Sequence, residues 1–212
     1  MAVNDFETAR EVARFMGRLY ARGLTTTSGG NISLRRGDVI FMTPAGTDKG
    51  NLETRDIGRL ALDGTILDEG FRPTCEAGLH LAVYHARQDI CAIVHAHPVT
   101  ASAFAASTAE ISTTLLYESA AVLGKIGRVP AIPFGTPELA VAAAETAKDF
   151  DVFLLNNHGA MALGCSLLQA FDRLEVAEFC ANSLLASRRL GGVKPITEEQ
   201  KKDLIKAFKL PE

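Results

Sequence analysis

The most restrictive feature of this sequence is a short apolar run that leads directly into two histidines. Residues 91–98 read CAIVHAHP, and the run 92–94 predicts a strand buried inside a sheet. Successive side chains of a strand alternate between its two faces, so His95 and His97 point to the same side. Pro98 ends the strand because proline has no N–H to donate to a neighbouring strand. The fold of this chain must therefore present two imidazoles together at one strand end.

Two neutral imidazoles in this arrangement can share one divalent metal ion, or they can simply pack against each other. Histidine is scarce, with five in 212 residues, and two of the five lie here, which favours a metal site. A third histidine, His158, follows a second predicted buried strand, 151–155, and precedes Gly159. Three histidines leave coordination positions open, which is typical of a catalytic rather than a structural zinc site.

Two loops rich in small residues are candidates for binding an anion. Residues 25–33 read TTTSGGNIS, in which a glycine pair frees backbone N–H groups and the hydroxyls and amide add neutral donors. That combination suits a phosphate, although an ordinary loop between a helix and a strand explains it equally well. Residues 43–47, TPAGT, form a second such loop, which is either another wall for the anion or a turn.

A helix is predicted to start at Pro73 and Thr74 and to run to about Arg87. Glu76 then lies in its first turn, where the helix dipole favours a carboxylate, and this alone explains the residue. A side chain there can also project over the neighbouring strand end. His80 lies four residues later on the same helix face and either supports the metal site or is simply buried.

The remaining pattern predicts alternating helices and strands. Helices are expected over 5–22, 98–107, 136–150, 166–190 and 197–208, and strands over 31–34, 39–42, 59–62, 65–68, 126–132 and 160–163. Ser166 is expected to cap the long helix, and residues 197–200, TEEQ, form a capping box for the last one.

Length and composition exclude several classes of protein. A chain of 212 residues without a linker-like segment predicts one domain, 1–212, and a mean hydropathy of +0.11 excludes disorder. A net charge of −3 with mixed signs argues against a nucleic-acid partner, and the short apolar stretches argue against a membrane. The N-terminus does not resemble a secretory signal, and four widely spaced cysteines predict reduced thiols, so a cytoplasmic protein is expected.

Four short motifs stand in a fixed order along the chain: SGGN at 28–31, PTCE at 73–76, HAH at 95–97 and HG at 158–159. Their order and spacing resembles the class II aldolase/ribulose-phosphate epimerase family, and within it the L-fuculose-phosphate aldolases. The resemblance spans nearly the whole chain. It implies an α/β fold, a three-layer α/β/α sandwich around one central, mostly antiparallel sheet. It also implies a homotetramer with active sites between subunits and a small phosphorylated sugar as substrate.

The resemblance also assigns roles to single residues. His95, His97 and His158 match the ligands of one Zn²⁺ per subunit. Glu76 matches the catalytic acid/base, which is a possible extra metal ligand without substrate, and Tyr117 matches a catalytic tyrosine that reaches a neighbouring subunit's site. The positions that match binders of the substrate phosphate are Ser28, Gly30, Asn31, Ala45, Gly46, Thr74 and Cys75.

Two departures from the fuculose enzymes bear on the substrate. Ala45 and Cys75 stand where those enzymes have hydroxyl residues, so phosphate binding there leans more on backbone N–H groups. The tail, 206–212, has no tyrosine, whereas the fuculose enzyme uses one there to close its site. The preferred sugar or aldehyde is therefore left open.

The activity that the resemblance implies is metal-dependent cleavage of a ketose 1-phosphate to dihydroxyacetone phosphate and an aldehyde. L-fuculose 1-phosphate or a 5-deoxypentulose 1-phosphate would be such a substrate. The alternatives in the same family are a ribulose-phosphate 4-epimerase, a methylthioribulose-phosphate dehydratase and a decarboxylase of phosphorylated sugar acids. The epimerases have Asp where this chain has Glu76. A non-catalytic binding module, as in the adducin head, has no reason to keep three histidines and this glutamate.

Overall fold

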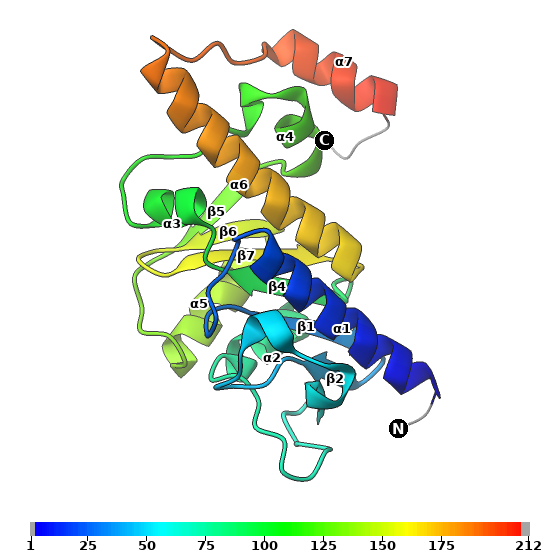
Figure 1. Cartoon of the computed structure of the whole chain (residues 1–212). Coiled ribbons are helices and arrows are strands. Elements are labelled where there is room, and N and C mark those ends of the chain that lie inside the picture. Colours follow the sequence, from blue (N-terminus) through cyan, green and yellow to red (C-terminus); the bar gives the residue numbers. More distant parts are fainter. Residues whose placement is uncertain (1–2, 209–212) are drawn as a thin grey trace.

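A seven-stranded sheet runs through the middle of the molecule, with helices on both of its faces (Figure 1). The computed structural model describes residues 3–208, so the end of the tail considered above, 209–212, lies outside the described residues. The helices are α1 Val3–Ala21, α2 Ala77–Ala86, α3 Val99–Ala105, α4 Tyr117–Val122, α5 Pro137–Ala147, α6 Leu167–Arg189 and α7 Glu198–Phe208. The strands are β1 Asn31–Arg36, β2 Val39–Met42, β3 Gly58–Ala61, β4 Ala92–Ala96, β5 Ile126–Val129, β6 Val152–Leu155 and β7 Gly159–Gly164.

The strand order is β3-β2-β1-β4-β7-β6-β5, and only the β5–β6 pair is parallel. β4 lies at the centre, as its apolar run predicts. Asn31 of β1 pairs with His95 on one side of β4, and Ala160 of β7 pairs with Ala96 on the other. This register brings the start of β1, the end of β4 and the start of β7 to one edge of the sheet.

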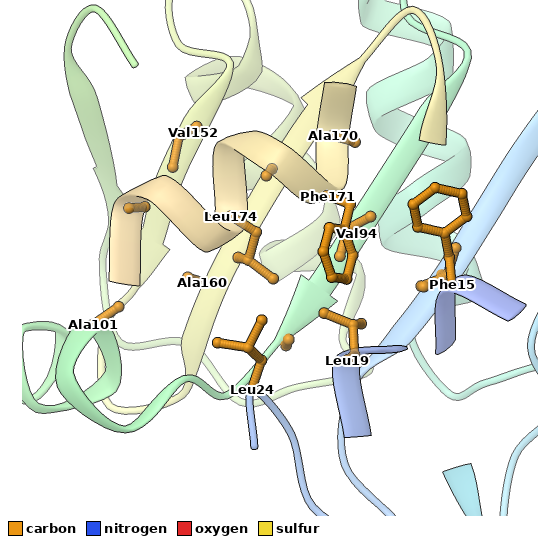
Figure 2. Packing of buried hydrophobic residues seen from close by; sticks show 14 of the residues in the cluster. Phe15, Leu19, Leu24, Val94, Ala101, Val152, Ala160, Ala170, Phe171 and Leu174 are labelled. Atoms are coloured by element: carbon orange, nitrogen blue, oxygen red, sulfur yellow. The ribbon is translucent and has the colours of Figure 1, made fainter. Parts of the chain in front are cut away.

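Successive residues of β4 supply two separate cores. Val94 packs with α1, α3 and α6 on one face, whereas Ile93 packs with α2 and α5 on the other. Figure 2 shows the first core, in which Phe15 of α1 and Phe171 of α6 stack edge to face with ring centroids 5.4 Å apart. Leu19 of α1 lies in the same cluster (Figure 2). These two cores on opposite faces confirm the predicted α/β/α sandwich with a mostly antiparallel sheet.

The predicted start of α2 is wrong by several residues. The helix begins at Ala77 because the chain before it is extended and attached to the loop at 43–47: Pro73 forms a β-bridge with Pro44, and Ala45 N donates to Arg72 O at 2.9 Å. Glu76 therefore occupies the N-cap position, with φ −98° and ψ 14°, and not the first turn.

Two predicted strands are also shorter than expected. The strand expected over 126–132 ends at Val129, directly before Pro130. The strand expected over 65–68 is reduced to a single bridge between Ile66 and Leu60, although the Asp63–Gly64 turn between the two arms is present.

Local capping signals are confirmed. Ser166 Oγ accepts from Gln169 N at 3.2 Å at the start of α6. At the start of α7, Thr197 N donates to Gln200 Oε1 at 2.8 Å, and Gln200 N donates to Thr197 Oγ1 at 3.2 Å. Among helices within 3–208, none combines the length and the apolar character needed to cross a bilayer.

Candidate active site

Three histidines from two separate segments meet at the sheet edge described above. His95 is the penultimate residue of β4, His97 directly follows this strand, and His158 lies in the turn between β6 and β7. Each offers one ring nitrogen, and these nitrogens all lie within 4.8 Å of one another. The Nε2 atoms of His95 and His97 are 3.2 Å apart. The structure thus brings together the three residues that the sequence predicted as metal ligands.

Glycines allow the backbone to pack closely around these histidines. A Cβ on Gly159 would lie 2.5 Å from Ala96 O and 2.6 Å from His97 Cδ2. Gly30 has φ 68°, and a Cβ there would lie 2.8 Å from His95 O. Any larger residue at either position would push the end of β4 away from its neighbours.

The three imidazoles have the chemistry of a metal site. His95 Nδ1 donates to Ala160 O at 3.0 Å, which leaves a lone pair on Nε2. Burial, together with the neighbouring His95 and His158, lowers the pKa of His97 to about 4. Burial also lowers the pKa of His158. Neutral imidazoles are the form that binds a metal ion, so this group of three ring nitrogens suits a divalent cation.

Glu76 lies against this histidine group and is itself only 4% exposed. Its Oε2 is 3.3 Å from His95 Nε2, and its Oε1 is 3.8 Å from His158 Nε2. Burial acts to raise the pKa of Glu76, but attraction to His95 and a hydrogen bond from Asn31 outweigh it, so the pKa is lowered. Oε1 is buried and has no hydrogen-bond partner among the described residues. This ionised oxygen also fits a site for a divalent cation.

A buried chain of hydrogen bonds holds the other oxygen of Glu76. Asn31 Nδ2 donates to Glu76 Oε2 at 2.8 Å, and Asn31 Oδ1 lies 2.6 Å from His80 Nε2. His80 Nδ1 lies 2.7 Å from Ser33 Oγ, which lies 2.8 Å from the hydroxyl of Tyr84. The chain therefore runs from Tyr84 on α2 through β1 to the carboxylate.

The direction of donation along this chain is fixed by its chemistry. Burial lowers the pKa of His80 to about 3, so its ring is neutral and carries one N–H. Because Asn31 donates to Glu76, its Oδ1 must accept, and the His80 proton is on Nε2. Nδ1 then accepts from Ser33. Each group donates toward Glu76, which orients the carboxylate. His80 was predicted either to support the metal site or to be simply buried. It is fully buried, and through Asn31 it also helps to orient Glu76.

This buried, neutral histidine predicts a dependence of stability on pH. Its folded pKa of about 3 lies below the usual 6.5, so only the unfolded chain takes up this proton between those values. We expect the free energy of unfolding to fall as the pH falls from 6.5 toward 3. His80→Gln, which retains a donor and an acceptor, should make this fall shallower by up to about 1.4 kcal/mol per pH unit. Urea unfolding of the parent and of His80→Gln, both without bound metal, at several pH values measures how the free energy of unfolding depends on pH in each protein. Equal slopes would contradict it.

A cavity of about 710 Å³ opens beside Glu76 and the histidines. The predicted residues that line it are Ser28, Gly30, Asn31, Ala45, Gly46, Thr74, Cys75, Glu76, His97 and His158. His95 is fully buried behind the wall. Tyr117 is 50% exposed at the start of α4 and does not line this cavity. Apart from these two, the cavity collects the whole predicted set from five segments of the chain.

The side chain of Asn31 is engaged with three other side chains of the protein. Its Nδ2 donates to Glu76 and, at 3.2 Å, to Thr74 Oγ1, and its Oδ1 accepts from His80. Both ends of the carboxamide are thus committed within the protein, and the side chain is only 3% exposed. Asn31 therefore positions Glu76.

Several residues of the site were missed from the sequence. Phe134 lines the cavity, is 65% exposed, and its ring centroid lies 5.9 Å from that of His158. Ser33 and Tyr84 had a detectable signal, because Ser33 lies two residues after Asn31 on one strand face and Tyr84 lies one helical turn after His80. Lys49 also lines the cavity and gave no signal, because it follows a loop in which a lysine is unremarkable.

Comparison with known proteins agrees with this geometry. The family "Class II Aldolase and Adducin N-terminal domain" matches residues 10–185. An L-fuculose phosphate aldolase of Methanocaldococcus jannaschii is 38% identical over 80% of this chain and 91% of its own length. A 5-deoxy-D-ribulose 1-phosphate aldolase of Bacillus thuringiensis serovar kurstaki is 32% identical over 93% of each chain. A 3-oxo-tetronate 4-phosphate decarboxylase of Escherichia coli K12 is 33% identical over 79% of this chain and 81% of its own length.

A solved structure of an L-fuculose 1-phosphate aldolase superposes with a TM-score of 0.87 and 29% identity, covering 96% of this chain and 97% of that one. The fold, the histidine group and these relatives define a lyase with a group of residues that can hold a metal ion. The chain belongs to the class II aldolase family and is similar to its fuculose-phosphate aldolases.

Proposed function

We propose that this enzyme cleaves a ketose 1-phosphate to dihydroxyacetone phosphate and an aldehyde, using one Zn²⁺ per subunit held by His95, His97 and His158. One observation carries the proposal: three imidazole nitrogens and the ionised Glu76 converge beside a cavity whose other walls include the two small-residue loops. The sugar-phosphate aldolases among the relatives support this choice of substrate. L-fuculose 1-phosphate and 5-deoxyribulose 1-phosphate are the first candidates.

The bound divalent ion supplies a positive charge that stabilises the negative charge developing when the C3–C4 bond breaks. Glu76 moves the proton at the carbon that loses its partner. Oε2 is held by Asn31, so Oε1, which has no hydrogen-bond partner among the described residues, is the oxygen that delivers the proton to this carbon in cleavage and removes it in the reverse reaction. The backbone N–H groups and hydroxyls of the loops at 25–30 and 43–47 bind the phosphate.

The assembly in this proposal is a homotetramer with sites between subunits. Tyr117 begins α4 and is half exposed, so its hydroxyl is available to a neighbouring subunit's cavity. There it orients the C4 hydroxyl and takes up its proton as the aldehyde forms, and it returns this proton in the reverse reaction. The proposed location is the cytoplasm, where thiols stay reduced, in agreement with four unpaired cysteines at 75, 91, 165 and 180.

A decarboxylase of a phosphorylated sugar acid is the second candidate. The Escherichia coli relative named above carries that activity in its name and is about as similar to this chain as the deoxyribulose-phosphate aldolase. Loss of CO₂ from a 3-oxo acid also leaves an enediolate-like charge, so the same cation site and the same proton carrier suit it. Only the product distinguishes the two reactions.

A coupled assay for dihydroxyacetone phosphate tests the first candidate. The panel comprises the 1-phosphates of L-fuculose, L-rhamnulose, D-ribulose, 5-deoxyribulose and methylthioribulose, each with and without a chelator. We expect release from at least one of them, abolished by the chelator and restored by zinc. A parallel CO₂ assay with 3-oxo-tetronate 4-phosphate tests the second candidate. Metal-bound protein that releases no dihydroxyacetone phosphate would contradict the aldolase proposal, and CO₂ release would replace it with the decarboxylase.

A further inference from the structure

Lys49 is a buried cation at the wall of the active-site cavity. It begins a short 3₁₀ helix, Lys49–Asn51, directly after the loop at 43–47. Its backbone N donates to Thr27 O at 2.8 Å, which joins this helix to the loop at 25–30. Lys49 is only 2% exposed, yet it lines the cavity together with Ser28, Gly46 and Cys75.

The ammonium of Lys49 has only neutral partners. Nζ donates to Pro44 O and, at 3.5 Å, to Thr47 Oγ1, and no carboxylate of the described residues lies within 4 Å. An ammonium carries three N–H donors, so one of them is left without an acceptor. Burial lowers the pKa of Lys49, against a weaker effect of the neighbouring Cys75 in the opposite direction, so the charge of this ammonium is held away from water.

An unpaired buried cation destabilises the folded protein. An anionic ligand that binds beside it offsets this cost in the bound state. The cavity supplies the space for that partner. The wall of the same cavity also includes Ser28 and Thr74, which bring hydroxyls, and the backbone of Gly30 and Gly46, whereas Ala45 and Cys75 bring no hydroxyl. The acidic group of the cavity, Glu76, is instead engaged with His95 and Asn31. This part of the wall therefore presents donors and a positive charge.

We infer that Lys49 binds the phosphate of the substrate directly, as the charged ligand of a site whose other groups are neutral donors. The choice of phosphate as the anion rests on the proposed function. The observation that Lys49 is a buried cation without an anionic partner among the described residues is independent of that function. A hydrogen bond to a charged group contributes far more than a neutral one, so Lys49 dominates affinity for the phosphate end of the substrate.

Binding of inorganic phosphate to the metal-loaded protein tests this inference. Lys49→Met keeps the length of the side chain and removes its charge. We expect it to weaken phosphate binding roughly 10- to 100-fold by isothermal titration, at an ionic strength held constant with KCl. The melting temperature without phosphate should be unchanged or higher, because an unpaired buried charge has been removed. Lys148→Met is the matched control: Lys148 is exposed and paired with Glu145, so phosphate affinity should stay at the parental value.

The outcomes separate the two proposals. Parental phosphate affinity in Lys49→Met, or no phosphate binding by the parent, would overturn the role of Lys49. A Lys49→Met protein that melts well below the parent without phosphate and binds phosphate normally would show a structural lysine instead. If Lys49→Met fails to fold, Lys49→Gln replaces it in the same titration, with the same expected loss. Phosphate binding that depends on Lys49, without aldolase activity on any sugar phosphate, would retain Lys49 and reject the proposed function.

Discussion

Glu76→Gln should slow cleavage of the ketose 1-phosphate by roughly a hundred- to ten-thousandfold while the protein keeps its metal. Glutamine has nearly the shape of glutamate and can still accept the hydrogen bond from Asn31, so the site should stay assembled. What it loses is the ionised oxygen, Oε1, which lies buried beside His158 and has no hydrogen-bond partner within residues 3–208. The measurement is kcat in the coupled assay, with metal content determined on the same preparation.

A second measurement separates proton transfer from substrate binding. In deuterated water the parent should exchange a carbon-bound proton of dihydroxyacetone phosphate, and Glu76→Gln should lose this exchange to the same extent as cleavage. Glu138→Gln is the control, because Glu138 is an exposed acid in the first turn of α5. Cleavage at the parental rate by Glu76→Gln would show that another group moves the proton.

His97→Ala should release the metal and abolish activity with it. Removing one of three imidazoles leaves two nitrogen ligands beside Glu76. Loss of a residue that only hydrogen-bonds to a metal ligand lowers metal affinity by up to roughly 100-fold, so loss of a ligand itself should lower it by at least this factor. The fold should survive, because His97 lies after the end of β4 and contributes to neither core. Metal content after gel filtration and an unchanged circular dichroism spectrum are the measurements.

His85→Ala is the matched control for His97→Ala. His85 is an exposed histidine on α2 whose Nε2 lies 3.0 Å from Leu62 O, outside the cavity. It should keep the parental metal content and rate. Full metal occupancy in His97→Ala would remove this residue from the ligand set and leave His95, His158 and Glu76 to hold the ion.

The sequence alone determined the parts of this protein that depend on neighbours along the chain. The period-two spacing of His95 and His97 predicted that both imidazoles point to one side, and the apolar run before them predicted the buried strand that is β4. The caps at Ser166 and Thr197 follow from hydrogen bonds that span three residues. Local signals of this kind need no knowledge of the rest of the fold.

Only the tertiary structure decided which groups face one another. Asn31 and Glu76 are 45 residues apart in the sequence. The register of β1 against β4 places Asn31 where its amide donates to the carboxylate of Glu76, whereas the motif around Asn31 suggested a phosphate ligand. The loop at 43–47 delays the start of α2, because Pro73 pairs with Pro44. The inferred role of Lys49 depends on its burial, because a lysine in a loop becomes a desolvated, unpaired cation only where other segments exclude water. Burial and long-range hydrogen bonds arise from the packing of distant segments, which no local pattern in the sequence encodes.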